Sequence, residues 1–402
     1  MYNTPTKRYD ALVYASIFSI MVLQFTLAIV TPGLGAIAEG LPGVRVELIQ
    51  MIQSIQGLVM VPAALLVSVL DRHIAKRQIL YIAIACILIG GTAPGFGGGI
   101  YFILLCRVIY GFGYGLVFPL AFAVIDGLFE GKQRDDMVGY ENAIGSFSGI
   151  LLQFLGGILA AISWRAIFLG YFIAIPFALL IIWKLPEPPQ KETGAGKGSK
   201  QTGYTAGLTR NTLALTSLNI VNWIMIFTFM TTISIVFTVE AIAPARNAAY
   251  ILMLFTFCAF LTGLVYGKVR LAIGNYTLAL SLGLLGCGLT ICLLSASIAM
   301  FCLAAVIFGF GFGFYTPEIN VLIMNSAAPE ASTASNSLFV ASTGIGQFLS
   351  PMILSVIITC FHLSGARSGW LVAGTSLIII GILAVVSAKA GGRTYKDSHV
   401  IT

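Results

Sequence analysis

Long apolar runs fill most of the chain, and short polar stretches separate them. Each run is about 20 residues long, which is the length that an α-helix needs to cross the hydrocarbon core of a bilayer. Ten-residue segments of alternating polarity, typical of membrane β-barrels, do not occur in the sequence. The pattern therefore predicts an all-α membrane protein with 12 transmembrane helices. Their expected ranges are 11–32, 48–70, 78–97, 100–126, 139–162, 166–183, 211–238, 248–266, 276–296, 299–325, 332–360 and 369–388.

The composition supports a membrane protein and excludes several other classes. Apolar residues make up 58% of the 402 residues and charged residues only 9%, against about 45–50% and about 25% in soluble domains. Because so few charges remain to cover a soluble surface, a soluble enzyme, a nucleic-acid-binding protein and a disordered chain are excluded. The seven cysteines form no CxxC pair, so we expect neither a disulfide framework nor a metal site. We also expect no cofactor.

The basic residues are divided unevenly between the two sides of the predicted helices. Seventeen of the 22 Lys and Arg lie on one side, four lie on the other, and Arg107 lies inside a span. Since positive charge accumulates on the cytoplasmic side of membrane proteins, we expect both termini in the cytoplasm. We expect the membrane to be a bacterial plasma membrane. The first run is too long for a signal peptide, and we expect it to be a retained helix.

Two internal matches relate one half of the chain to the other. The glycine-rich segment 108–119 in the fourth span matches 306–317 in the tenth at an offset of 198 residues. Segment 142–155 in the fifth span matches 336–349 in the eleventh at an offset of 194 residues. Both matches pair helices that lie six spans apart, so we infer a duplicated unit of six helices.

A polar stretch between the sixth and seventh spans separates these units. Residues 184–210 are rich in Pro, Gly, Ser and Lys, which is the composition of a linker. The predicted organisation is therefore two pseudo-symmetric six-helix bundles, with residues 1–183 as the N-terminal bundle and 211–402 as the C-terminal bundle. The linker is expected on the cytoplasmic side.

Several motifs resemble those of the major facilitator superfamily. Asp71 and Arg72, with Lys76 and Arg77, lie between the second and third spans, where that family has a G-x-x-x-D-R-x-G-R-[RK] motif. Arg107 and the glycines that follow it are similar to the family's fourth-span motif, which is common in proton-coupled members. The glycines of the fifth span resemble the drug-antiporter motif without its Gly-Pro pair. The resemblance implies a secondary transporter in which two bundles rock around a central site.

Glu318 is the candidate proton-coupling residue. A charge inside the bilayer costs about 2.5–3.5 kcal/mol on insertion scales, so an intramembrane acid suggests a function. Glu318 is the only acid well inside a predicted span, and the matching position in the other half is Leu120. The repeated scaffold therefore does not require an acid there. Pairing with a neighbouring helix is the structural alternative.

A set of polar and aromatic side chains inside the spans is interpreted as substrate-binding. Asn219, Asn222 and Trp223 share one helix face because they lie three and four residues apart. Hydrogen bonding or packing between helices is the structural alternative for each residue of the set. The predicted set comprises Gln24, Arg107, Gln153, Asn219, Asn222, Trp223, Phe227 and Gln347.

Charged residues at the cytoplasmic ends of the spans are interpreted as a gate. The predicted gating residues are Asp71, Arg72, Lys76, Arg77, Asp126 and Glu141. We expect the first four to latch the cytoplasmic side in the outward-open state, with the last two as partners. Positive-inside topology alone is the structural alternative, and it explains the bases but not Asp71.

The sequence as a whole favours a monomeric secondary transporter that exports a lipophilic or amphipathic compound in exchange for protons. Proton- or anion-coupled uptake or exchange of a small organic anion is the alternative. The three histidines lie in loops or the tail, and the chain has no HExxH or GxSxG motif. An intramembrane enzyme is therefore not expected. The duplicated halves argue against a channel or receptor.

Overall fold

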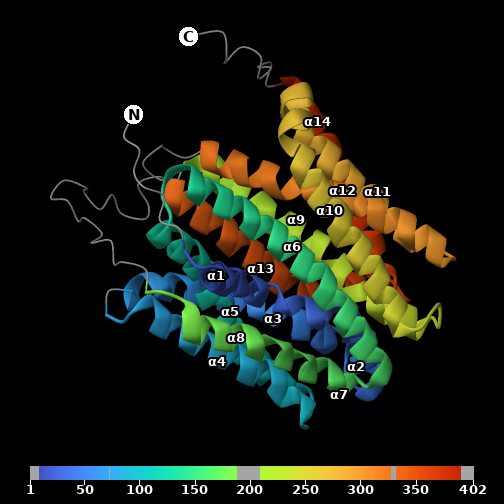
Figure 1. The fold of residues 1–402 in the computed structure, drawn as a ribbon. Helices are drawn as coiled ribbons and strands as arrows, with labels where there is room; N and C mark the ends of the chain where they lie inside the picture. The colour runs from blue at the N-terminus through green and yellow to red at the C-terminus, as the bar shows by residue number, and fades with distance from the viewer. Residues whose placement is uncertain (1–8, 72, 188–208, 327–331, 391–402) are drawn as a thin grey trace.

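The computed structural model describes residues 9–71, 73–187, 209–326 and 332–390, and these residues form helices joined by short turns (Figure 1). We call α1–α8 the N-terminal half and α9–α14 the C-terminal half. The N-terminal half comprises α1 (Ala11–Gln24), α2 (Leu34–Gly40), α3 (Val46–Leu70), α4 (Lys76–Thr92), α5 (Ile100–Leu128), α6 (Gly131–Ile162), α7 (Trp164–Leu169) and α8 (Ala174–Lys184). The C-terminal half comprises α9 (Arg210–Val239), α10 (Ala245–Ile273), α11 (Thr277–Leu294), α12 (Ile298–Asn325), α13 (Ser332–Cys360) and α14 (Ser368–Ala390).

The described helices include ten segments long and apolar enough to cross a membrane, or eleven if a bent pair counts as one span. One of the ten, Arg246–Leu294, is 49 residues long and contains both α10 and α11. The chain is therefore an all-helical, multi-pass membrane protein. The number of 12 helices and their division into two symmetric bundles stay predictions.

The first predicted span is bent. Segments Ala11–Gln24 and Thr26–Gly40 meet at 48°, and two turns of 3-10 helix, Thr26–Ile29 and Thr31–Gly33, lie between α1 and α2. Pro32 within the second turn has no N–H to donate to a regular helix, so the α-helical hydrogen-bond pattern is interrupted here. The helical path continues to Gly40, whereas the sequence pattern placed its end at residue 32.

Helix α10 is longer than the predicted span 248–266, because it continues to Ile273. It ends at Gly274, whose φ of +55° is a conformation that glycine adopts without steric cost. Lys268 and Arg270, which the sequence placed in a loop, therefore lie on the last turns of a helix. This extension brings Arg270 into contact with Glu318, as described below.

The buried apolar side chains form two separate clusters. One consists of side chains from 17–185 together with Ile235, and the other of side chains from 223–377. Many large apolar side chains outside these clusters are exposed, among them Tyr101 at 76%, Trp183 at 72% and Leu264 at 67%. Such an apolar surface is unfavourable in water but suits the hydrocarbon core of a bilayer.

The two halves meet mainly along three pairs of helices: α2 with α9, α3 with α13, and α6 with α10. Helix α3 also contacts α9. We call the end of the molecule that carries the connections 41–45, 163, 240–244 and 361–367 the outer end, after the orientation that the basic residues predict. The opposite end is the inner end. Helices α2 and α7 lie at the outer end, at the lower right of Figure 1.

The crossing of α3 and α13 depends on two glycines that face each other. A Cβ atom at Gly57 would lie 2.7 Å from the Gly344 carbonyl oxygen, and one at Gly344 would lie 2.3 Å from the Gly57 carbonyl oxygen. These distances are shorter than van der Waals contact, so only residues without a side chain let the backbones approach this closely.

Candidate functional site

Glu318 is buried between α10 and α12 and has two partners. Its Oε2 accepts a hydrogen bond of 2.7 Å from the Tyr266 hydroxyl and lies 3.1 Å from Nε of Arg270. The exposed fraction is 3% for the Glu318 side chain and 20% for the Arg270 side chain. A buried carboxylate is stable only when it is paired and hydrogen-bonded, and this trio meets both requirements.

Position along the helices explains how the trio forms. Glu318 lies seven residues before the inner end of α12 at Asn325, which is about 10 Å of helix. Tyr266 and Arg270 are one turn apart, so they present their side chains on the same face of α10. The sequence did not single out Tyr266, which ends an apolar run, and it placed Arg270 in a loop beyond the predicted span. The spacing of four residues between a tyrosine and an arginine was the available signal.

A hydrogen-bonded cluster joins α9, α12 and α13 around Asn219. Its Nδ2 donates to the Ser342 hydroxyl at 2.7 Å, and its Oδ1 accepts from the Tyr315 hydroxyl at 2.8 Å. All three side chains are at most 1% exposed. Asn219 therefore fastens three helices of the C-terminal half to one another.

The other predicted residues of α9 are also buried. Asn222, Trp223 and Phe227 have exposed fractions of 0%, 6% and 2%. The Trp223 ring packs edge-on against Phe312 with ring centres 5.6 Å apart, and among the described residues its indole nitrogen has no hydrogen-bond partner. Phe227 belongs to the apolar cluster of the C-terminal half.

The three predicted glutamines lie on α1, α6 and α13. Gln24 is buried and donates from Nε2 to the Phe118 carbonyl at 3.3 Å, while its Oε1 has no partner among the described residues. Gln153 on α6 exchanges hydrogen bonds of 3.0 and 3.2 Å with Thr256 on α10, across the two halves. Gln347 lies beside Gly57, since a Cβ there would be 3.2 Å from its Oε1.

Arg107 is fully buried inside the N-terminal half. Its Nη1 donates to the Tyr171 hydroxyl at 2.9 Å and its Nη2 to the Gly91 carbonyl at 3.4 Å. The guanidinium carbon lies 4.9–5.1 Å from the ring centres of Tyr110, Phe168 and Tyr171. These contacts come from α4, α5 and the segment 164–173, which all belong to the N-terminal half. The contacts therefore hold Arg107 within that half.

The predicted gating residues lie at the inner end. Asp71 Oδ1 is 2.8 Å from the Lys76 ammonium, and Asp126 forms an ion pair with Arg134. Arg77 donates to the Tyr81 hydroxyl at 2.7 Å and to the Ile182 carbonyl at 2.9 Å. Arg72 and the side chain of Glu141 lie outside the described residues.

A contact between the halves that the sequence did not indicate lies at the outer end. The Ser234 hydroxyl on α9 donates to the Pro32 carbonyl at 2.6 Å and accepts from the Gly35 N–H at 3.0 Å. A Cβ atom at Gly35 would lie 2.3 Å from the Ser234 carbonyl oxygen. These contacts hold α2 tightly against α9, so the halves are closed on each other here.

Two cavities border the interface between the halves near the outer end. One, of about 350 Å³, lies between α3, α9 and α13 and the turn before α14. The other, of about 290 Å³, lies between α6 and α10 and is lined mainly by apolar side chains, with Arg246 and Tyr250.

Comparison with known proteins identifies the family. The model of the Major Facilitator Superfamily matches residues 16–247, more than half of the chain. The chain is 30% identical over 114 residues to "Multidrug resistance protein 3" of Bacillus subtilis (strain 168), and 30% identical over 132 residues to "Multidrug efflux pump SdrM" of Staphylococcus aureus (strain N315). The matched segments cover 28% and 31% of this chain and only 22% and 29% of those relatives.

Solved structures of transporters share the fold. The nucleoside transporter NupG superposes with a TM-score of 0.78 over 94% of this chain and 99% of NupG, at 12% identity. A D-xylose-proton symporter gives 0.71 over 92% of this chain and 96% of its own, at 14% identity. A bacterial homologue of the lysosomal transporter Spinster, in an inward-facing conformation, gives 0.69 over 94% and 95%, at 16% identity. Because the family model matches more than half of the chain, the chain belongs to the Major Facilitator Superfamily, and its long apolar helices make it a multi-pass membrane protein.

Proposed function

We propose that this protein is a proton-coupled secondary transporter that exports a lipophilic or amphipathic compound by alternating access. The observation that carries the proposal is the buried trio of Glu318, Arg270 and Tyr266. A carboxyl group shielded from water and held by one cation can exchange that cation for a proton. Proton binding would release Arg270 from the ion pair and so change how α10 and α12 pack against each other. The balance between two conformations of the protein would then depend on the proton gradient.

The proposed substrate site includes buried polar atoms that lack protein partners. Gln24 Oε1 and Trp223 Nε1 are such atoms among the described residues, one in each half. An unpaired buried polar atom costs about 1–3 kcal/mol, so a substrate that supplied a donor and an acceptor would recover this energy. We keep Gln24, Gln153, Asn219, Asn222, Trp223, Phe227 and Gln347 as the proposed substrate-binding set.

The direction of transport is part of the proposal. The names of the two partial relatives, a multidrug resistance protein and a multidrug efflux pump, support export. The apolar cavity between α6 and α10 also fits a compound that prefers lipid to water. We further propose a monomer in a bacterial plasma membrane, with both termini cytoplasmic and with bundles 1–183 and 211–402 joined by 184–210.

The test is transport in proteoliposomes that carry an imposed pH gradient. A panel of fluorescent lipophilic compounds and small organic anions is assayed in both directions. We expect Glu318→Gln to abolish gradient-driven transport while substrate exchange without a gradient continues. Full gradient-driven transport by this variant would overturn the proton-coupling role, and accumulation of an anion would favour the uptake alternative.

A matched control is available at the outer end of the protein. Glu240 also pairs with an arginine, since its Oε2 lies 2.7 Å from Nη2 of Arg367, but its side chain is 31% exposed. Glu240→Gln should keep gradient-driven transport. The double variant Glu318→Gln, Arg270→Gln removes both charges of the buried pair, so it separates loss of coupling from misfolding caused by an unpaired Arg270.

A further inference from the structure

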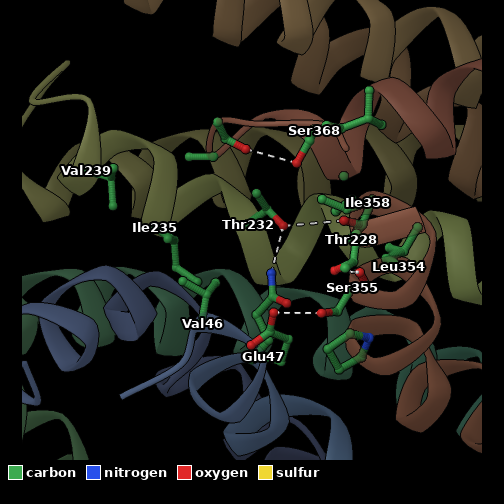
Figure 2. A pocket seen from close by; sticks show the side chains of 17 residues that line it. Val46, Glu47, Thr228, Thr232, Ile235, Val239, Leu354, Ser355, Ile358 and Ser368 are labelled. Carbon is green, nitrogen blue, oxygen red and sulfur yellow. Dashed lines mark hydrogen bonds between the residues drawn. The ribbon is translucent and has the colours of Figure 1, made fainter. Parts of the chain in front are cut away.

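The cavity of about 350 Å³ at the outer end is built from both halves of the protein. Helix α3 supplies Glu47 and Gln50, α9 supplies Thr228 and Thr232, and α13 supplies Ser355 (Figure 2). Its volume lies within the range of about 300–1,000 Å³ that is typical of small-molecule sites. None of its lining residues belongs to the proposed substrate or proton sites.

One carboxylate and a row of hydroxyl groups form the polar wall. Oε1 of Glu47 accepts a hydrogen bond of 2.7 Å from the Ser355 hydroxyl. Gln50 Nε2 donates to the Thr232 hydroxyl at 3.1 Å, and this hydroxyl lies 3.3 Å from that of Thr228. Figure 2 shows both sets of bonds within the same cavity. The polar wall therefore presents one negative charge and several hydrogen-bond acceptors.

The remaining wall of the cavity is aliphatic. Val46, Ile235, Leu354 and Ile358 contribute to it. A cavity that combines one carboxylate with several aliphatic side chains fits a molecule with an apolar body and one positively charged group. Arg45 is the cation nearest to Glu47 that the structure shows, with 3.5 Å between Nε and Oε2, and its side chain is 77% exposed. Exposed ion pairs contribute little energy, so a bound ammonium group can replace Arg45.

We propose that this cavity is a regulatory site for small amphipathic cations, which bind from the outer side and hold the two halves closed there. A ligand that contacts both halves binds more tightly when the halves lie together at the outer end than when they are apart. Its binding therefore favours the closed conformation, to the extent of this difference in affinity. Because α3 belongs to one half and α9 and α13 to the other, separation of the halves divides the site. Binding therefore inhibits transport.

The binding test uses the full chain in lipid nanodiscs, with empty nanodiscs to subtract partitioning into lipid. The probes are phenethylamine, protonated at neutral pH, and 2-phenylethanol, which has the same shape without the charge. Isothermal titration should show that the cation binds at least about tenfold more tightly, because a charge-assisted hydrogen bond to Glu47 is lost with the alcohol. Equal affinity for the two probes would overturn the proposal.

Two variants and one control locate the binding. Glu47→Gln should reduce the affinity for phenethylamine to that for 2-phenylethanol, whereas Glu39→Gln, which changes an exposed acid on α2, should leave it unchanged. Val239 is 63% exposed at the edge of the cavity, so Val239→Trp should fold and should block both probes. Unchanged phenethylamine binding in Glu47→Gln and Val239→Trp would show that the cation binds elsewhere.

The regulatory part is tested by substrate exchange in proteoliposomes without a pH gradient. Phenethylamine added outside should slow exchange in the unmodified protein and in Glu318→Gln, but not in Glu47→Gln. Exchange does not require proton coupling, so this result is independent of the role of Glu318. Unimpaired exchange at a phenethylamine concentration that fills the site would refute inhibition.

Discussion

Glu318 and Arg107 are both charged side chains within apolar helices, and the protein accommodates them differently. Glu318 is paired with a cation on a neighbouring helix, so a single proton can change its interactions. Arg107 is surrounded by three aromatic rings and two oxygen acceptors, and its charge is permanent. Their environments suit a proton-dependent role for Glu318 and a packing role for Arg107.

This difference predicts that Arg107 contributes mainly to stability. Tyr171→Phe removes the hydroxyl that accepts from Arg107 and should lower the free energy of unfolding by about 1–3 kcal/mol. Arg107→Lys loses the planar guanidinium that faces the rings and should destabilise to a similar extent. Thermal unfolding in detergent measures both effects. Arg165→Lys is the control, because Arg165 is exposed and lies over the ring of Trp164.

A substrate-binding role for Arg107 predicts the opposite result. In that case Arg107→Lys would keep the unfolding temperature and lose substrate affinity. The two roles are therefore separated by measuring substrate binding and thermal unfolding on the same preparation.

At the scale of elements, the crossing of α3 and α13 limits how closely the halves approach. Gly344→Ala places a methyl group 2.3 Å from the Gly57 carbonyl oxygen, so the helices must move apart or the halves cannot close. We expect Gly344→Ala to reduce the transport rate at least about tenfold, since tight helix packing tolerates little added volume. Gly283→Ala on α11 meets nothing within 4 Å and should transport normally.

The broken first helix provides a second prediction at this scale. Gly35→Ala would clash with the Ser234 carbonyl and the Thr238 hydroxyl, each 2.3 Å from the new Cβ. The contact of α2 with α9 would then be lost, and the protein would favour a conformation that is open at the outer end. Labelling by a membrane-impermeant thiol reagent of a cysteine introduced near Ser234 should become faster. Unchanged labelling would show that α2 does not control this opening.

The sequence predicted where most helices lie along the chain, but it did not predict which of their residues contact one another. Hydropathy reports which segments avoid water, so most helix positions follow from it. It could not reveal that α10 continues to Ile273, because Lys268 and Arg270 interrupt the apolar run at a point where the helix itself does not end. The bend after Gln24 was missed for a related reason, since the apolar run continues through it.

The candidate sites were harder to predict than the helices. Glu318 stood out as an intramembrane acid, but its partner Tyr266 is an ordinary residue in an apolar run. Ser234 and Gly35 are small residues without any distinguishing pattern, and only the packing of α2 on α9 brings them together. Contacts between distant segments depend on helix rotation and tilt, which residue spacing does not determine.

At the scale of the whole molecule, the inner end is proposed to contain a latch. Asp71 and Lys76 form a partly exposed ion pair of 2.8 Å in the connection between α3 and α4, and exposed pairs contribute about 0–1 kcal/mol. A bias of this size shifts the populations of two conformations that have similar energies. We expect Asp71→Asn to increase the accessibility of introduced cysteines at the inner end. The charge exchange Asp71→Lys, Lys76→Asp should restore the original accessibility if the pair itself is the latch.

Because the two apolar clusters are almost separate, we predict that the two halves still assemble when they are expressed as two separate chains. Each cluster is built almost entirely from its own half, with Ile235 as the exception. Residues 1–187 and 209–402, expressed together as two chains, should associate and recover transport at a reduced rate. Co-purification followed by a transport assay checks this. Failure of either chain to accumulate in the membrane without a covalent link would contradict independent folding of the halves.

The bond between Ser234 and α2 also has a consequence for solvent. Gly35 lies in the first turn of α2, where a helix leaves its N–H groups without internal acceptors, and Ser234 supplies the acceptor from the opposite half. When the halves separate, this N–H and the Pro32 carbonyl lose their partner, and a backbone polar group without a partner is costly unless water reaches it. Water must then enter to replace it. Opening of the outer end is thus a wetting step, and an osmolyte that withdraws water should slow it.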